Sequence, residues 1–253
     1  MARARALSHV TFATALSAVS LAWLGCFASA CGTTTTDHES AVQRGQKDLD
    51  DPHAFSTSKF AYFACTKCHS TQGTPPSDRI YPGGTLEGAA SRPAFWAGRF
   101  DSLHDAVNEC VTHFQRGDAI KVDAASVVDL SAYLVSIGGT GQTASVPFTV
   151  TKVTKDLPPG DAGRGAVIWS RSCKNCHGDA HTGDGKIGNA SRVPEDTQTF
   201  HGSDGPVVVR EVVIEKIRTG SFLDFAGQMP PFSQELLTDG DVSDVVSYLG
   251  LYP

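Results

Sequence analysis

Methionine is almost absent from this chain of 253 residues: apart from Met1, the sequence contains only Met229. Any site that needs a thioether is therefore restricted to one position. Long runs of like charge are absent too, which excludes an acidic or basic interaction tail. Aromatic residues make up 8% of the chain and hydrophobic residues 40%. That composition is typical of globular domains with modest cores.

An apolar run of any length occurs only near the N-terminus. Two arginines precede it, small residues end it, and the Thr-rich stretch GTTTTDHES follows. A basic start, a short apolar run and small residues before a cleavage site are typical of a secretory signal peptide, here residues 1–30. No basic residues follow the run to stop transfer, so a membrane span is the weaker interpretation.

The small residues before Cys31 resemble a bacterial lipoprotein signal. On that interpretation Cys31 is acylated, and residues 31–39 form a Thr-rich tether to a membrane. Cys26 is a weaker alternative for the acylated residue. A plain cut after Ala30, giving a soluble exported protein, is the other possibility. Both versions predict an exported protein of the periplasm or cell envelope.

The mature chain is expected to be acidic. Removing residues 1–30 takes away two arginines and no acidic residue, which lowers the formal net charge from −6 to −8. Such a surface argues against nucleic acid and favours partner proteins with basic docking surfaces.

Four of the seven cysteines form two close pairs, in CTKCH (65–69) and CKNCH (173–177). The C-x-x-C-H pattern is the attachment signature of c-type haem. Residues i, i+3 and i+4 share one helix face, so both thiols reach the porphyrin vinyl groups while the histidine lies under the iron. We therefore predict two covalently bound haems. Their attachment residues and proximal ligands are Cys65, Cys68 and His69 in one motif, and Cys173, Cys176 and His177 in the other.

Two other uses of the cysteine pairs are weaker. A thioredoxin-like redox pair needs a βαβ context, which the sequence lacks, and would not need a histidine twice. A four-cysteine zinc site usually brings its pairs within about 15–20 residues. Here the pairs are separated by more than a hundred residues of sequence.

The segments around the two motifs repeat one plan. Gly165 and Trp169 precede Cys173 in GRGAVIWSRSCKNCH, which resembles the first helix of class I cytochrome c. The earlier copy begins at RGQKDLDD. It contains an insertion at Asp51-Pro52, where a helix is expected to break because proline disfavours helical backbone in the residue before it.

Helical periodicity continues downstream of each motif. Residues 101–117 place Leu103, Val107, Cys110 and Phe114 on one stripe. Residues 208–220 place Val209, Val212, Val213 and Ile217 similarly, although their Val and Ile content would also suit a strand. Each copy then ends in a similar helix, over residues 127–134 and 242–249. In these helices Asp129, Tyr133 and Leu134 match Asp244, Tyr248 and Leu249.

Residues 139–159 are rich in Gly, Thr and Pro, which is linker composition. We therefore predict an all-α fold of two tandem cytochrome c-like domains, residues 40–138 and 160–253. Each domain is built around one haem.

Met229 is the expected sixth ligand of the second haem. It lies in AGQMPPF, 52 residues after His177, and the two prolines after it fix an extended backbone. A His/Met ligand pair raises the reduction potential of a haem, which suits an electron carrier.

The first domain has no methionine. Its helix over residues 101–117 contains Cys110 on the apolar stripe and His113 one turn further. A cysteine without a disulfide partner needs a reason in an exported protein, which favours Cys110 as the iron ligand. His113 is the alternative. A third possibility is a merely buried thiol beside an open or Lys121-ligated iron.

The order of residues here also resembles a known family. VNECVTHFQRG followed by LSAYL is similar to the N-terminal haem domain of dihaem thiosulfate dehydrogenases and to the cysteine-ligated subunit of the bacterial sulfur-oxidising complex. The resemblance covers about 40 residues, with Asn108, Cys110, Gly117 and Tyr133 in matching order. It implies that the Cys110 thiolate ligates the first iron opposite His69.

The sequence therefore predicts a dihaem cytochrome that passes electrons between a redox donor and a redox acceptor. The alternative is an oxidoreductase of the thiosulfate dehydrogenase type, with substrate chemistry at the first haem and Cys110 as its catalytic residue. Arg79, Arg92, Arg99 and Arg116 are candidates to line a substrate site, although scattered arginines are usually surface residues or partners of haem propionates.

Overall fold

The computed structural model describes residues 39–55, 62–139, 146–150, 153–195, 200–202, 205–220 and 227–252. The predicted signal peptide and the lipidation candidate Cys31 lie outside these residues. Within the described ranges, no helix has the length and apolar character required to cross a membrane.

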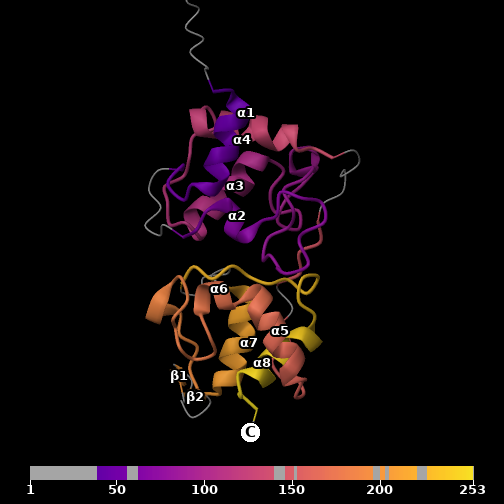
Figure 1. Cartoon of the computed structure of the whole chain (residues 1–253), viewed down its shortest axis with the longest axis vertical. Helices are drawn as coiled ribbons and strands as arrows, with labels where there is room; N and C mark the ends of the chain where they lie inside the picture. The colour runs from indigo at the N-terminus through magenta and orange to yellow at the C-terminus, as the bar shows by residue number, and fades with distance from the viewer. Residues whose placement is uncertain are drawn as a thin grey trace, which may run out of the picture. The chain divides into compact units, whose positions relative to one another are not determined.

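Helices dominate the described chain, as predicted (Figure 1). We call residues 39–139 the N-terminal half and residues 153–252 the C-terminal half. The first contains α1 (Ala41–Asp50), α2 (Cys65–Cys68), the 3-10 turn η1 (Ala89–Ser91), α3 (Leu103–His113) and α4 (Ala125–Ser136). The second contains α5 (Ala162–Ser172), α6 (Lys174–His177), the 3-10 turn η2 (Gly188–Ser191), α7 (Val209–Thr219) and α8 (Asp239–Tyr248).

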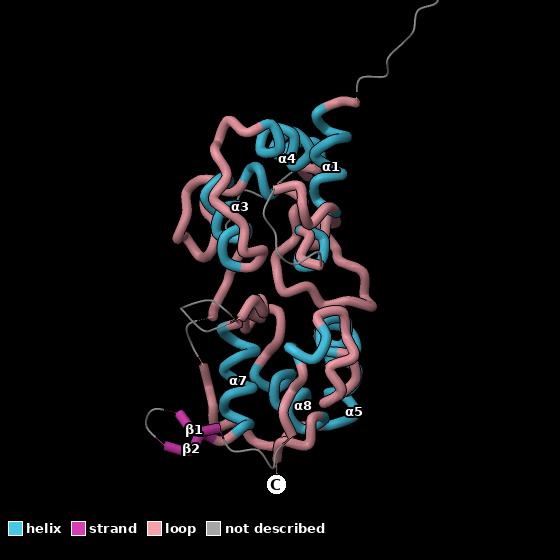
Figure 2. The backbone as a smooth tube through the Cα atoms, turned by 90° about the vertical axis from the view of Figure 1, so that its left-hand side faces the viewer, coloured by secondary structure: helices cyan, strands magenta, loops and turns pink. Residues whose placement is uncertain are grey.

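One short ribbon interrupts the helical pattern. Strands β1 (Phe200–Gly202) and β2 (Gly205–Val207) pair antiparallel, directly before α7 (Figure 2). The segment from 209 to 219 is a helix, so the strand alternative for it is wrong.

Helix α1 ends where the sequence predicts. Asp50 is its last residue, and Asp51 has extended backbone before Pro52. Ser40 caps the start of the helix with a capping box. Its hydroxyl oxygen accepts from the Gln43 backbone N–H, and its own backbone N–H donates to the Gln43 side-chain oxygen.

In each half, the first helix packs against the last one: α1 on α4, and α5 on α8 (Figures 1 and 2). A glycine permits each close approach. A Cβ on Gly45 would lie 2.0 Å from the carbonyl oxygen of Asp129, and one on Gly165 would lie 2.0 Å from that of Asp244. No larger residue fits at either position without moving the helices apart.

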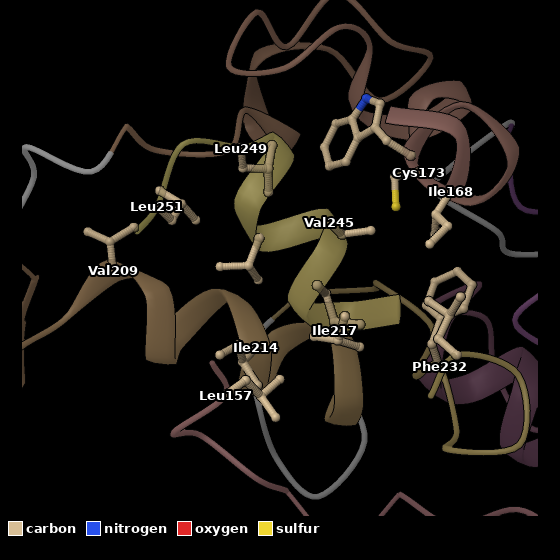
Figure 3. Packing of buried hydrophobic residues seen from close by; sticks show 14 residues of the cluster. Leu157, Ile168, Cys173, Val209, Ile214, Ile217, Phe232, Val245, Leu249 and Leu251 are labelled. Carbon is tan, nitrogen blue, oxygen red and sulfur yellow. The ribbon is translucent and has the colours of Figure 1, made fainter. Parts of the chain in front are cut away.

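The core of the C-terminal half lies around α8 (Figure 3). Ile214 and Ile217 of α7 lie on one side of α8, and Val245 of α8 points toward Ile168 of α5 on the other. A second cluster fills the N-terminal half, from α1, α3, α4 and the loop after α1: Leu49, Phe55, Val111, Leu130, Tyr133 and Leu134.

Candidate functional site

Helix α2 brings the first C-x-x-C-H motif into one turn. His69 follows directly, and its backbone N–H donates to the Cys65 carbonyl at 2.9 Å. The Nδ1 atom of His69 lies 2.7 Å from the Gly84 carbonyl oxygen. A carbonyl only accepts, so Nδ1 carries the proton and Nε2 keeps a lone pair for a metal. The loop thereby fixes the orientation of the His69 ring.

The second motif repeats this arrangement in α6. The Nδ1 atom of His177 donates to the Ser191 carbonyl at 2.5 Å, which leaves its Nε2 available as well. Trp169 of α5 holds the turn after the motif, because its indole N–H donates to the Gly178 carbonyl at 2.9 Å. Burial lowers the pKa of both His69 and His177, which favours the neutral imidazole that metals require.

Gly83 fixes the His69 ring from one side. A Cβ at this position would lie between 2.3 and 2.8 Å from three atoms of the imidazole. The neighbouring Gly84 is less restricted, since a Cβ there would meet only Val146, at 3.6 Å and beyond. Gly83 is thus a close-approach glycine beside His69, a role that the sequence pattern did not reveal.

Cys110 lines the same cavity as the first motif. This cavity, which we call the first cavity, is lined by Cys65, Cys68, His69 and Cys110 together. Its walls are mainly apolar and include Phe63, Leu86, Leu103, Val107, Val111 and Phe114. Burial raises the pKa of the Cys65 thiol to about 11 and that of Cys68 to about 12, and it raises the pKa of Cys110 as well. An apolar cavity of this kind fits a porphyrin face.

His113 is not among the described residues that line the first cavity. Its Nδ1 atom lies 3.8 Å from the Glu109 carboxylate on the same helix. Lys121 is exposed and does not line the cavity either. Of these three candidates, only Cys110 belongs to the described lining of the first cavity.

His104 and Asn108 hold the loop after α3. The carbonyl of Ile120 lies 2.9 Å from His104 Nε2 and accepts from the Asn108 amide at 3.2 Å, while the Ile120 N–H donates to Asn108 Oδ1 at 2.8 Å. The Asn108 side chain therefore has a structural role, which is to hold the backbone of the loop after α3.

A second cavity contains the other motif together with Met229. Cys173, Cys176, His177 and Met229 all line it, and so do the apolar side chains of Trp169, Val212, Val213, Ile217 and Phe232. Met229 is partly buried and packs against the core of the C-terminal half. Two thiols, an imidazole with an available Nε2 and a thioether are the donors that a c-type haem with His/Met ligation requires.

The four arginines that were candidates to line a substrate site have different surroundings in the structure. Arg92 lines the first cavity, and its Nη2 donates to the Thr85 carbonyl at 2.6 Å. Burial lowers the pKa of Arg92. Arg99 instead pairs with Glu109 at 3.4 Å, and Arg79 lies 4.3 Å over the Tyr81 ring. Arg116 donates to the Gly227 carbonyl at 2.7 Å.

Trp96 is a cavity residue that sequence reasoning missed. It has a positive φ of 52°, which is uncommon for a bulky residue, in the turn between Phe95 and Phe100. Its ring stacks on Phe114, with the centroids 6.0 Å apart and the planes inclined by 10°. The turn thus places a flat aromatic wall at the first cavity.

No disulfide joins the five described cysteines. Among the residues that the structure describes, no cluster of three or more His, Cys, Asp or Glu side chains is placed to hold a metal ion.

Comparison with known proteins supports a cytochrome. Residues 160–249 match the family described as cytochrome C oxidase, cbb3-type, subunit III. The match supports a cytochrome c domain in the C-terminal half; domains of this type bind a covalent c-type haem, transfer electrons and interact with redox partners. Such domains are typically periplasmic or exported. No curated protein matches this sequence.

One solved structure resembling the chain is the thiosulfate dehydrogenase TsdBA from Marichromatium purpuratum, in its as-isolated form. The sequence identity is 15% and the TM-score 0.41. The match covers 83% of this chain but only 45% of that one.

Proposed function

We propose that this protein is an exported dihaem c-type cytochrome that transfers electrons one at a time. One haem belongs to the domain at residues 40–138 and the other to the domain at residues 160–253. The attachment residues are Cys65, Cys68, Cys173 and Cys176, and the proximal ligands are His69 and His177. When bound, the two irons supply the redox chemistry, and the chain supplies ligation, orientation and exclusion of water.

The sixth ligands differ between the two domains. Cys110 is the proposed ligand of the first iron, because it lines one cavity with Cys65, Cys68 and His69. Met229 lines the second cavity with Cys173, Cys176 and His177, which supports a thioether ligand for the second iron. A thiolate donates more charge than a thioether, so the first site is expected to have the lower potential.

The difference in ligands gives electrons a direction. They enter at the low-potential first site and leave from the high-potential second site to an acceptor protein. The formal net charge of −8 after removal of residues 1–30 favours acceptors and donors with basic docking surfaces. A lipid on Cys31 would keep the protein at a membrane.

Low-temperature EPR of the oxidised protein tests the Cys110 ligand. We expect one low-spin signal with a narrow spread of g values, lost in Cys110→Ala and retained in His113→Ala. His113 is the matched control because it lies on the same helix one turn away but does not line the cavity. A signal of bis-histidine type that is unchanged in Cys110→Ala would overturn the assignment.

A second candidate function is substrate oxidation at the first haem. Arg92 favours it, because a partly buried cation that lines the same cavity as Cys110 would attract an anion such as thiosulfate. Adding thiosulfate to the oxidised protein tests this function. Haem reduction that fails in Arg92→Gln would support an enzyme, and an absence of reduction would leave the carrier function.

A further inference from the structure

Arg218 is a charged side chain with no exposed surface, at the C-terminal end of α7. Its Nη1 atom donates to the carbonyls of Phe232, Ser233 and Leu237, at 3.2, 3.3 and 2.5 Å. Its Nη2 atom donates to the Asp239 carboxylate at 2.7 Å. Burying a guanidinium is costly unless partners satisfy it, and these four contacts satisfy Nη1 and Nη2, while Nε has no hydrogen-bond partner among the described residues.

All four partners of Arg218 belong to one stretch, the segment that begins at Met229 and ends at the start of α8. We call residues 229–239 the methionine loop. The Phe232 N–H also donates to the Ile217 carbonyl at 2.9 Å, next to Arg218 in the sequence. The loop is therefore fastened to the last turn of α7 by main-chain and side-chain contacts together.

Gly220 completes the attachment at Met229 itself. It has a positive φ of 58°, and a Cβ there would lie 2.2 Å from the Met229 carbonyl oxygen and 2.7 Å from the Pro230 carbonyl carbon. The backbone of Met229 thus lies directly on the end of α7. Arg218 holds the part of the loop that follows.

The N-terminal half lacks this arrangement. Gln115 stands two residues before Gly117, as Arg218 stands two residues before Gly220. It is also buried, but its Nε2 donates to the Phe63 carbonyl at 2.5 Å, and its Oε1 has no hydrogen-bond partner. The buried arginine therefore occurs in the half with a methionine loop, and a neutral amide with a different partner occurs in the half without one.

We propose that Arg218 is a positioning residue that keeps the Met229 thioether at its iron. This inference rests on the proposed role of Met229 as sixth ligand of the second haem. A thioether is a neutral ligand without charge attraction to the iron, so its occupancy depends on how firmly the loop is held. Four contacts from one buried cation restrict the loop over residues 232–239 and limit its movement away from the haem.

The test uses the holoprotein with Arg218→Gln and Arg218→Lys. Gln occupies the corresponding position in the other half. Lys keeps the positive charge but lacks the planar fork of N–H donors that a guanidinium has. Arg210→Gln is the matched control, since Arg210 lies on the same helix and stacks 5.1 Å over Tyr252 instead of contacting the described residues of the methionine loop. Two signals are read: the red charge-transfer band of Met-ligated ferric haem, and the rate at which imidazole binds the ferric iron.

We expect Arg218→Gln to lose most of that band and to bind imidazole roughly tenfold to a hundredfold faster, because hydrogen bonds to a charged group contribute about 1.5–3 kcal/mol. Arg218→Lys should be intermediate, and Arg210→Gln should match the parent protein. A purely structural role would lower the melting temperature without changing either signal, and that result would overturn the inference.

Two further variants separate the possible failures. If the parent protein lacks the charge-transfer band and Met229→Ala changes nothing, the ligand assignment itself is wrong. If Arg218→Gln yields no holoprotein, Asp239→Asn and Arg218→Lys provide the test instead. Faster imidazole binding in both variants than in the parent protein supports the inference. Binding at the parental rate in both variants overturns it.

Discussion

Arg164 donates from Nε and Nη2 to the two carboxylate oxygens of Asp244, at 2.8 and 2.9 Å, and Arg44 forms the same pair of bonds to Asp129, at 2.7 Å each. Each arginine precedes the close-approach glycine of its helix. The crossing of the first and last helices is therefore fixed in both halves by the same three positions: an arginine, a glycine and an aspartate.

Asp244→Asn should reduce stability, and the loss should depend on pH. The hydrogen bonds from Arg164 lower the pKa of Asp244. A carboxyl group with a lowered pKa stabilises the fold above its ordinary value near 4 and ceases to do so as pH falls through the lowered value. We expect a loss of about 1 kcal/mol at pH 7, below the range of about 1.5–3 kcal/mol for a charged hydrogen bond, because Arg164 is 68% exposed.

Urea unfolding of parent and variant at neutral and acidic pH measures this difference, which should shrink toward pH 3. Glu195→Gln is the control, because its pair with Arg192 is exposed on both sides, at 57% and 59%. An equal effect of the two substitutions at pH 7 would contradict a special role for Asp244.

Gly165→Ala should destabilise the C-terminal half, because the new methyl group would lie 2.0 Å from the Asp244 carbonyl oxygen. Overpacking of this kind typically costs about 1–3 kcal/mol. Gly163→Ala is the matched control on the same helix. Its Cβ would meet only a side-chain oxygen of Asp161 at 3.2 Å, and alanine favours helix over glycine by about 1 kcal/mol. Thermal unfolding should therefore shift in opposite directions, and a parallel shift would refute the packing explanation.

The helices and the stripe on α3 were predictable because they depend on local sequence. Leu103, Val107, Cys110 and Phe114 were expected on one face, and all four line the first cavity. The break at Asp51 followed from Pro52. The turn at Trp96 could not be predicted, because none of its neighbours in the sequence requires a positive φ at this residue.

Ion pairs between residues far apart in the chain could not be predicted from the sequence. Arg44 and Asp129 are 85 residues apart, and periodicity gives no sign that two charged side chains meet. Arg218 was harder still, because a charged residue on a helix is usually solvated, and its burial depends on a loop that begins eleven residues later. Gly83 and Gly84 differ only in their neighbours, which are the His69 ring for Gly83 and the Val146 side chain for Gly84.

Gly83→Ala should disturb the first haem and leave the second intact. A Cβ at Gly83 would overlap the His69 ring, so the imidazole would have to move from its orientation toward the iron. The absorption and EPR spectra of the oxidised protein should show one haem changed to high spin. Gly84→Ala adds the same methyl group one residue later, where Val146 is 3.6 Å away, and should leave both spectra unchanged. Identical spectra for the two variants would contradict the proximity of Gly83 to a ligated His69.

Cys110→Met should bring the two haem potentials together. A redox titration of the parent protein should show two separate waves, since the first site has a proposed thiolate ligand and the second a proposed thioether. Axial ligands set haem potentials over a range of about 0.8 V, so exchanging thiolate for thioether should raise the lower wave by roughly a few tenths of a volt. His113→Met adds a thioether outside the lining of the first cavity and should leave both waves in place. A lower wave that does not move in Cys110→Met would mean that the Cys110 sulfur does not set the potential of the first site.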